Sequence, residues 1–151
     1  MDIRIDDLSG PEVKQILTEH LEDMFAASPP ECVFALDLDG LKKPNITFWT
    51  VWEDSQLLGC GALKVLGDTH GEIKSMRTTS AARNKGVAST LLHHILDTAK
   101  QKGLNKISLE TGLQDFFAPA RKLYAKHEFT ECGPFSDYKL DPYSVFMTRS
   151  L

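Results

Sequence analysis

The segment from residue 72 to residue 110 constrains the fold more than any other part of this chain. A strand-like run, Glu72 to Thr79, precedes an amphipathic helix, and a second strand-like run, Lys106 to Glu110, follows it. The apolar residues of the helix recur at every fourth position: Val87, Leu91, Ile95 and Ala99. A strand, a helix and a strand in this order predict a right-handed crossover between parallel or near-parallel strands. The chain is therefore expected to belong to the α/β class.

The loop that enters this helix, Arg83 to Ser89, has the composition of a phosphate-binding loop. Gly86 and Ala88 allow close approach to the backbone, and Arg83 and Lys85 supply positive charge. The first N–H groups of a helix have no intrahelical acceptor, and the helix dipole favours an anion there. The nucleotide-binding patterns G-x-x-x-x-G-K-[ST] and G-x-G-x-x-G are both absent from the sequence. The loop therefore predicts a phosphate ligand of another kind.

The strand before this loop contains an irregularity. Ile73 and Met76 are three residues apart, so a strict period of two cannot bury both on one face. A bulge near Ser75 to Arg77 would bring them to the same face, and bulges are frequent beside active sites. A local bend, or burial on both faces, explains the pattern equally well.

The N-terminal part predicts an edge strand followed by two helices. Residues Asp2 to Asp6 alternate as in a strand, and Ser9 and Glu12 have the spacing of a capping box, with Pro11 in the first helical turn. The apolar stripe of that helix consists of Val13, Ile16, Leu17, Leu21, Met24 and Phe25. A shorter helical segment is expected from Val33 to Leu38.

The remaining elements complete one sheet. Asn45 to Trp52 and Leu57 to Leu66 are expected to form a hairpin, and Phe116 to Lys126 a further helix. The last two strands are expected at Thr130 to Cys132 and Ser144 to Ser150, with a long loop between them. The predicted order of elements is β-α-α-β-β-β-α-β-α-β-β.

Composition and charge limit the classes of function. The 151 residues suit a single domain over residues 1–151, and a hydrophobic content of 42% is typical of folded globular chains. The net charge of -4 disfavours nucleic-acid binding. No apolar run reaches the about 18 residues of a membrane helix, and the short acidic N-terminus is unlike a signal peptide, so we expect no membrane partner and a cytoplasmic location. The cysteines Cys32, Cys60 and Cys132 lack C-x-x-C spacing, so neither a metal site nor a disulfide is expected.

Two motifs of the chain resemble the GNAT family of acetyl-CoA-dependent N-acetyltransferases. The family's cofactor motif, [Arg/Gln]-x-x-Gly-x-[Gly/Ala], is matched by Arg83, Gly86 and Ala88. About forty residues further on, many members carry Asn-x-x-Ala-x-x-Leu-Tyr-x-x-x-Gly-Phe. The residues that match this second motif are Ala120, Leu123, Tyr124 and Phe129. Phe117 stands where the family often has Asn, and Glu128 where it usually has Gly.

The resemblance implies the family's fold and co-substrate. The fold is a central mixed, mostly antiparallel sheet with a splayed parallel pair, flanked by helices, and the co-substrate is acetyl-CoA, with no metal. The pyrophosphate of CoA would bind the N–H groups of Asn84 to Ser89, and the backbone at Met76 and Thr78 would pair with the pantetheine. The residues expected at the cofactor are Met76, Arg77, Thr78, Arg83, Asn84, Lys85, Gly86, Val87, Ala88, Ser89, Thr111, Phe117 and Ala120.

Acetyl transfer to an amine requires groups that move protons. By its alignment with the family, Tyr124 is the candidate acid that protonates the departing CoA thiolate, and packing against the cofactor is the alternative role. Glu72 and Glu110 are the candidate bases. Glu72 begins the strand before the phosphate loop, where some members of the family carry a catalytic Glu, and Glu110 ends the neighbouring strand, where the site is expected to open. A water relay without a unique base is the alternative to both.

The expected acceptor is the primary amine of a small molecule. His20, Met24 and Trp49 are the leading candidates for binding it. A wider set of candidates comprises Ser28, Glu31, Phe34, Phe135, Tyr138 and Tyr143. Their aromatic content favours an amine with an apolar part, and the acidic net charge is compatible with a cationic acceptor.

Two other functions are compatible with the same fold. One is a non-catalytic CoA-binding sensor or regulatory module, and the other is a protein N-acetyltransferase with an open peptide groove. Small members of the family are often dimers, so a homodimer is a further possibility. In such a dimer the strand around Val145 to Thr148 could pair across the interface.

Overall fold

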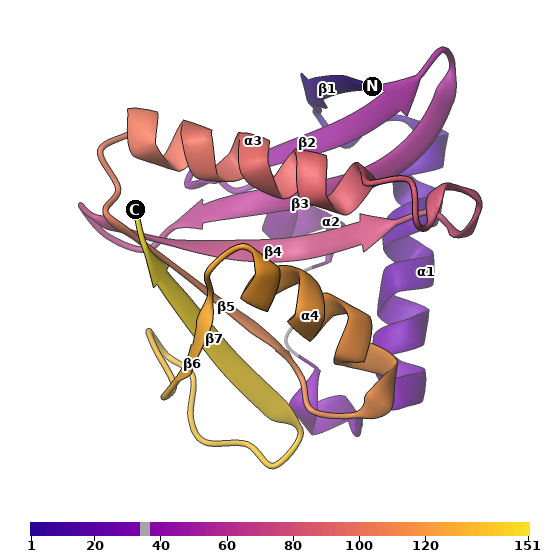
Figure 1. Cartoon of the computed structure of the whole chain (residues 1–151). Helices are drawn as coiled ribbons and strands as arrows, with labels where there is room; N and C mark the ends of the chain where they lie inside the picture. The colour runs from indigo at the N-terminus through magenta and orange to yellow at the C-terminus, as the bar shows by residue number, and fades with distance from the viewer. Residues whose placement is uncertain (34–36) are drawn as a thin grey trace.

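A computed structural model describes residues 1–33 and 37–151 of the chain. Its sheet has seven strands in the order β1-β2-β3-β4-β5-β7-β6, with helices on both faces (Figure 1). The strands are β1 (Asp2–Ile5), β2 (Ile46–Glu53), β3 (Gln56–Val65), β4 (His70–Thr78), β5 (Lys106–Gly112), β6 (Thr130–Cys132) and β7 (Ser144–Ser150). All neighbouring strands pair antiparallel except β4 and β5, which pair parallel. The predicted mixed, mostly antiparallel sheet is confirmed.

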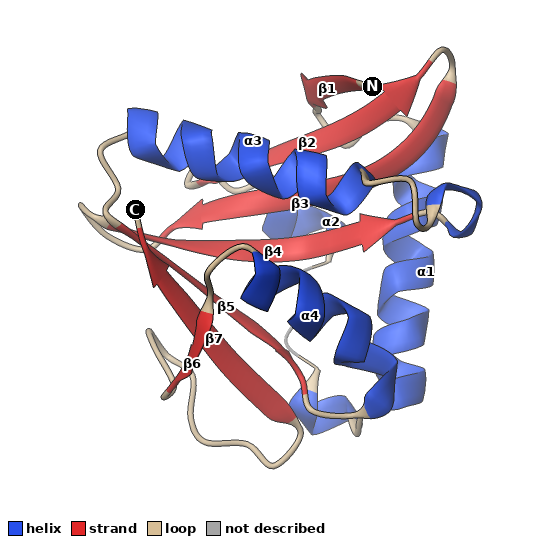
Figure 2. Cartoon of the chain, in the orientation of Figure 1, coloured by secondary structure: helices blue, strands red, loops and turns tan. Residues whose placement is uncertain are grey.

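The helices divide between the two faces of the sheet (Figure 2). They are α1 (Pro11–Ala27), α2 (Leu38–Leu41), α3 (Val87–Gln101) and α4 (Ala118–Lys126), with short 3-10 turns at Pro30–Cys32, Ser80–Ala82 and Asp115–Phe117. Helices α3 and α4 cover one face, and α1 and α2 cover the other. The sheet is therefore the middle layer of three, and each face has its own apolar core.

The two cores follow from the periodicity of the helices. The predicted stripe of α3 is buried, and it packs on the sheet with Ile73 of β4 and Leu109 of β5. On the other face Val13, Ile16 and Leu17 of α1 are buried against β2 and β3. Phe25 was expected in the same stripe, but it is 52% exposed because it lies in the last turn of α1, beyond the edge of the sheet.

Strand β4 contains the bulge that its sequence pattern predicts. In the ladder with β3, Cys60 is opposite Arg77 and Ala62 is opposite Lys74, so two residues of β4 face one residue of β3. The extra residue is accommodated at Ser75, whose φ of 57° is rare for a residue with a side chain. As a result Ile73 and Met76 both reach the core under α3.

Strand β4 separates from β5 after a short parallel contact. The paired residues run from His70 opposite Lys106 to Ile73 opposite Leu109. Beyond Ile73 the two strands diverge, as Figure 1 shows. The backbone groups of β4 that face this opening are therefore available to a ligand.

Two expectations about the N-terminal helices need correction. Helix α1 is preceded by Gly10 and not by a capping Ser9, because the Ser9 hydroxyl donates to Asp7 Oδ1 at 2.6 Å. Pro11 does occupy the first turn, as expected. The second helix, α2, begins only at Leu38, and residues 34–36 of the segment predicted to be helical lie outside the described residues.

Strand β7 lies inside the sheet. It pairs with β5 over its whole length and with β6 from Phe146 to Thr148. From Phe146 to Thr148 both hydrogen-bonding edges are thus occupied within this chain, which disfavours the expectation that this stretch pairs across a dimer interface; a homodimer stays a prediction. Within residues 1–33 and 37–151, no helix has the length and apolar character needed to cross a membrane.

Candidate active site

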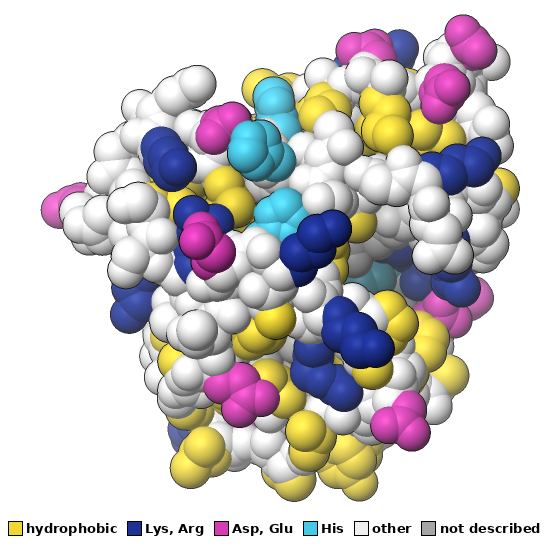
Figure 3. Space-filling view, in the orientation of Figure 1, with side chains coloured by type: hydrophobic (Ala, Val, Ile, Leu, Met, Phe, Trp, Pro, Cys, Tyr) yellow, Lys and Arg dark blue, Asp and Glu magenta, His cyan; other side chains and the backbone are white. Residues whose placement is uncertain are grey.

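A cavity of about 640 Å³ extends along the opening between β4 and β5. Its walls come from α1, β4, the loop before α3, β5, α4 and the loop between β6 and β7. The volume is within the usual range for ligand pockets. The space-filling view shows a hollow between α3 and α4, with Lys and Arg side chains around it (Figure 3).

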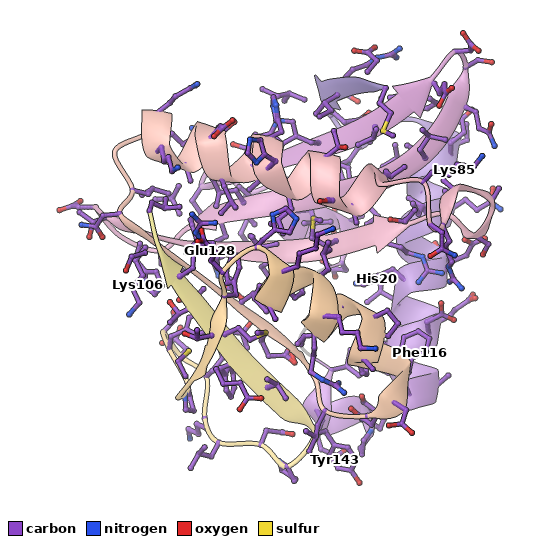
Figure 4. All side chains as sticks on the ribbon, in the orientation of Figure 1. His20, Lys85, Lys106, Phe116, Glu128 and Tyr143 are labelled. Carbon is purple, nitrogen blue, oxygen red and sulfur yellow. The ribbon has the colours of Figure 1, made fainter. Side chains whose placement is uncertain are left out.

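One end of the cavity is formed by the predicted phosphate loop. Gly86 precedes α3 with a φ of 77°, a conformation that favours glycine, and a Cβ at this position would meet no heavy atom within 4 Å. The loop therefore turns sharply and leaves open space in front of the first N–H groups of α3. Arg83 and Asn84 line the same end. Lys85 is exposed and lies outside the cavity lining, on the loop labelled in Figure 4.

The middle of the cavity lies between β4 and α4. Met76, Arg77 and Thr78 form one wall, and Phe117 and Ala120 are on the other. Except for Lys85, every residue predicted at the cofactor lines the cavity. The others that do so are Arg83, Asn84, Gly86, Val87, Ala88, Ser89 and Thr111. The arrangement fits a long ligand with a phosphate at the loop and an extended arm along β4.

Phe117 stands where the related motif often has Asn, and its side chain forms an apolar part of the wall. It is 7% exposed, and its ring lies directly over Gly112. A Cβ at Gly112 would overlap that ring, so glycine is required there for Phe117 to pack. This part of the wall is therefore apolar at the position where the related motif often has an amide.

The first candidate base, Glu72, is held in a buried cluster. Its carboxylate accepts a hydrogen bond from the Tyr138 hydroxyl at 2.6 Å and pairs with Lys74 Nζ at 3.1 Å. Lys74 Nζ also donates to the Tyr138 hydroxyl at 2.9 Å. The Glu72 and Lys74 side chains are only 3% and 8% exposed. Such a buried pair is costly to break, because removal of either partner would leave the other as an unpaired buried charge.

The second candidate base, Glu110, is less tightly engaged. Ser144 Oγ donates to its carboxylate at 3.2 Å. Burial raises the pKa of Glu110 to about 7, and the Ser144 hydrogen bond and Lys74 oppose this shift. A carboxyl group of this pKa exchanges protons readily near neutral pH.

The candidate acid, Tyr124, lines the cavity and is 7% exposed. Its ring packs edge-on against Phe129, at 5.8 Å between centroids. Burial raises the pKa of Tyr124 well above its usual value, and the nearby charge of Glu110 adds to the effect. The phenol is therefore protonated over the physiological pH range.

The predicted acceptor residues fall into two groups. His20, Met24, Ser28, Tyr138 and Tyr143 line the cavity. Figure 4 shows His20 on α1, with Phe116 below it beside the start of α4 and Tyr143 further down near the start of β7. These acceptor candidates come from α1, from the chain just after it and from the loop between β6 and β7, so segments distant in the sequence line one part of the cavity.

The other predicted acceptor residues are not part of the cavity. The prediction for Trp49 is wrong, because its side chain is 2% exposed in the core under α3 and meets the His94 ring edge-on. Phe135 packs on His70 and Phe146, and neither it nor Glu31 is among the described lining residues. Phe34 lies outside the described residues.

Several residues of the cavity were missed from the sequence, among them Lys74, Cys32 and Phe116. Lys74 had a detectable signal, because it is two residues from Glu72 and so faces the same side of β4. A hydrogen bond to Asp141 raises the pKa of Cys32 to about 11, so this thiol stays protonated. Phe116 is 50% exposed at the rim, and no pattern in the sequence separates it from a core aromatic.

Three comparisons with known proteins agree with this geometry. Residues 13–129 match the model of the acetyltransferase (GNAT) family. The uncharacterized N-acetyltransferase YsnE of Bacillus subtilis is 52% identical over 151 residues, which is 100% of both chains. The uncharacterized N-acetyltransferase YedL of Escherichia coli is 49% identical over 99% of this chain and 94% of its own. The IAA acetyltransferase of Azospirillum brasilense is 37% identical over 89% of this chain and 86% of its own.

Solved structures share the fold at low sequence identity. The ribosomal-protein-alanine N-acetyltransferase of Brucella melitensis superposes with a TM-score of 0.75 at 18% identity, over 100% of both chains. An aminoglycoside 6'-N-acetyltransferase complexed with coenzyme A superposes with a TM-score of 0.71 at 16% identity, over 99% of this chain and 97% of that one. The family match and the full-length relatives lead to one conclusion: the chain belongs to the acetyltransferase (GNAT) family and is an N-acetyltransferase.

Proposed function

We propose that this enzyme transfers an acetyl group from acetyl-CoA to the primary amine of a small molecule, by direct attack of the amine. The observation that carries the proposal is the continuity of the cavity. The same cavity of about 640 Å³ is lined by the phosphate loop at one end and by Glu110 and Tyr124 further along. Both substrates would thus be held in one geometry, which supplies much of the rate of a bimolecular reaction.

The donor end is suited to CoA. The turn at Gly86 and the first N–H groups of α3 would bind the pyrophosphate, with Arg83 as countercharge. The backbone of β4 beyond Ile73 would pair with the pantetheine, because β5 has diverged there. When bound, acetyl-CoA supplies the acetyl group as a reactive thioester. An N–H group of β4 near Met76 would stabilise the negative charge that develops on the thioester oxygen.

Glu110 is the better candidate base of the two carboxylates. Its pKa, raised to about 7 by burial, allows it to take a proton from the acceptor ammonium near neutral pH. Glu72 is engaged by both Lys74 and Tyr138, so we assign it to the support of the acceptor end. Tyr124, whose raised pKa keeps its phenol protonated, would donate a proton to the departing thiolate.

We favour a small molecule as the acceptor because several segments line this end of the cavity. They are α1, the segment around Ser28 and Cys32, and the loop between β6 and β7 with Tyr138 and Tyr143. A peptide acceptor would need an open groove through these segments. The names of the full-length relatives also favour a catalyst over a non-catalytic sensor.

The first test is release of CoA thiol from acetyl-CoA in the presence of a panel of small amines, a lysine peptide and IAA. We expect turnover with a small amine, with kcat/KM rising as pH increases through about 7, because Glu110 acts only when it is deprotonated. Glu110→Gln should lower kcat by about 100-fold or more and remove this rise. Tyr124→Phe should lower kcat with little change in the KM for acetyl-CoA.

Two outcomes would contradict these roles. A Glu110→Gln enzyme with the wild-type pH profile would assign proton removal to water or another group. A Tyr124→Phe enzyme with unchanged kcat over a broad pH range would reduce Tyr124 to a packing role. Binding of CoA without turnover on any amine would contradict the proposed reaction itself.

A further inference from the structure

The charged side chains around the cavity do not reflect the acidic balance of the whole chain. The net charge is -4, yet among the described lining residues the cations Lys74, Arg77 and Arg83 outnumber the carboxylates Glu72 and Glu110. Arg83 belongs to the phosphate loop, and Lys74 is paired with Glu72 at 3.1 Å. Arg77 is the third cation, and its partner Asp23 is not among the described lining residues. The net charge of the chain is therefore a poor guide to the charge of the acceptor.

Arg77 has unused hydrogen-bonding capacity inside the cavity wall. Its Nη2 pairs with Asp23 Oδ2 at 2.7 Å, and its side chain is 12% exposed. Its Nε is buried, and within the described part of the chain it has no hydrogen-bond partner. A buried donor without a partner costs about 1–3 kcal/mol. Because Arg77 lines the cavity, a bound ligand or a water is a candidate partner for its guanidinium.

The surroundings of Arg77 favour a carboxylate as the missing partner. A guanidinium presents Nε and Nη donors in a planar fork that matches the two oxygens of a carboxylate. His20 lies beside it on α1 and also lines the cavity. Burial, assisted by the charge of Arg77, lowers the pKa of His20 to about 4, so its imidazole is neutral and can donate an N–H without adding charge.

The phosphates of CoA already have a binding site of their own. The loop at Gly86 and the start of α3 face the other end of the cavity, with Arg83 beside them. Arg77 is on β4, after the bulge, and its side chain is directed to α1 through its pair with Asp23. This is the wall that α1 closes at the acceptor side.

We propose that the acceptor is an amine that also carries a carboxylate, such as an amino acid. Its carboxylate binds Arg77, with His20 beside it, and its amino group is directed to Glu110 on the neighbouring strand. The inference rests on the proposed acetyl transfer and adds the class of acceptor to it.

The experiment compares matched acceptors that differ only in charge at one end. Each L-amino acid is assayed beside its carboxamide and beside the amine that lacks the carboxyl group. For the best amino acid we expect kcat/KM to be at least about tenfold higher than for its carboxamide. The carboxamide lacks the charge-assisted bidentate contact with the guanidinium. Binding is measured separately, as the thermal shift that each compound produces on the CoA-bound enzyme.

Variants of the same wall make the test specific. Arg77→Gln should bring the carboxylate-to-carboxamide ratio close to one, and Arg77→Lys should restore it only in part. Asp23→Asn should increase the ratio, because it frees Nη2 for the ligand. Arg83→Gln is the contrast on the donor side: it should raise the KM for acetyl-CoA and leave the ratio unchanged.

Each outcome decides between the two proposals. Equal turnover of carboxylates and carboxamides, or an Arg77→Gln enzyme that keeps the wild-type ratio, would overturn the inference and leave acetyl transfer intact. A rise in the KM for acetyl-CoA alone in Arg77→Gln would assign Arg77 to the donor and would also overturn it. Absence of turnover with every amine would overturn the proposed function, and the thermal shifts would still decide whether carboxylates bind at Arg77.

Discussion

The donor end and the acceptor end of the cavity are built in different ways. The donor end consists of one short segment, Arg83, Asn84 and Gly86 to Ser89, and of the backbone of β4. The acceptor end consists of side chains that come from α1, β4, β5 and the loop between β6 and β7. Backbone groups recognise what all family members share, the CoA donor. Side chains from separate segments vary independently, so they are suited to define the acceptor.

The largest effect is expected from a side chain of the acceptor end. Lys74→Met leaves the Glu72 carboxylate buried without its ion pair, at 3% side-chain exposure, and should lower the free energy of unfolding by about 3–5 kcal/mol. Urea denaturation measures this loss. The double variant Glu72→Gln, Lys74→Met should recover most of it, because no charge is then left unpaired. If the free energy of unfolding of Lys74→Met were within about 1 kcal/mol of the wild-type value, the ion pair would not be needed for stability.

A change in the backbone of the donor end should affect binding of one substrate only. Gly86→Val places a branched residue at a φ of 77°, in front of the first turn of α3, and should raise the KM for acetyl-CoA by about tenfold without changing the KM for the amine. Gly103→Val is the matched control, because Gly103 has a φ of 85° at the other end of α3 and equally open space around it. Both variants should lose similar stability. Equal KM values for acetyl-CoA in the two variants would contradict the role of the loop.

The smallest effect concerns the stability cost of Glu110. Its pKa is raised from 4.5 to about 7 in the folded protein, so the folded state binds more protons than the unfolded state between these values. Stability contributed by this group is therefore present at low pH and lost as pH rises through 7. Glu110→Gln should be more stable than the wild type at pH 8 and equal to it at pH 4. Thermal unfolding at the two pH values measures the difference, and a gain that is independent of pH would contradict the assignment.

The donor end was largely predictable from the sequence because its information is local. The phosphate loop is a contiguous segment, and the spacing of Ile73 and Met76 pointed to a local irregularity, with a bulge as one of three explanations. The crossover from β4 through α3 to β5 follows from hydrophobic periodicity and the handedness of such connections. These features depend on residues within a few turns of one another.

The acceptor end could be predicted only in part, because it depends on contacts between distant segments. Tyr138 reaches Lys74 across 64 residues of sequence, from a loop without a regular pattern. Trp49 was assigned to the acceptor because aromatic residues are common in pockets, but its face of β2 packs under α3. Neither result could be obtained without knowing the order of the strands in the sheet.

The bulge at Ser75 also affects how this enzyme can change by insertion or deletion. Removing Ser75 would give a regular ladder with β3, in which Met76 is opposite Gly61 and Arg77 stays opposite Cys60. Ile73 and Met76 would then keep their places in the core under α3, and Arg77 would stay on the side of α1. A single codon deletion at this point would therefore leave the packing of both faces in place and remove only the local irregularity of the strand. An insertion or deletion elsewhere in β4 would instead exchange its two faces from that point onward, so the bulge is the one position of this strand where a change of length is expected to be tolerated.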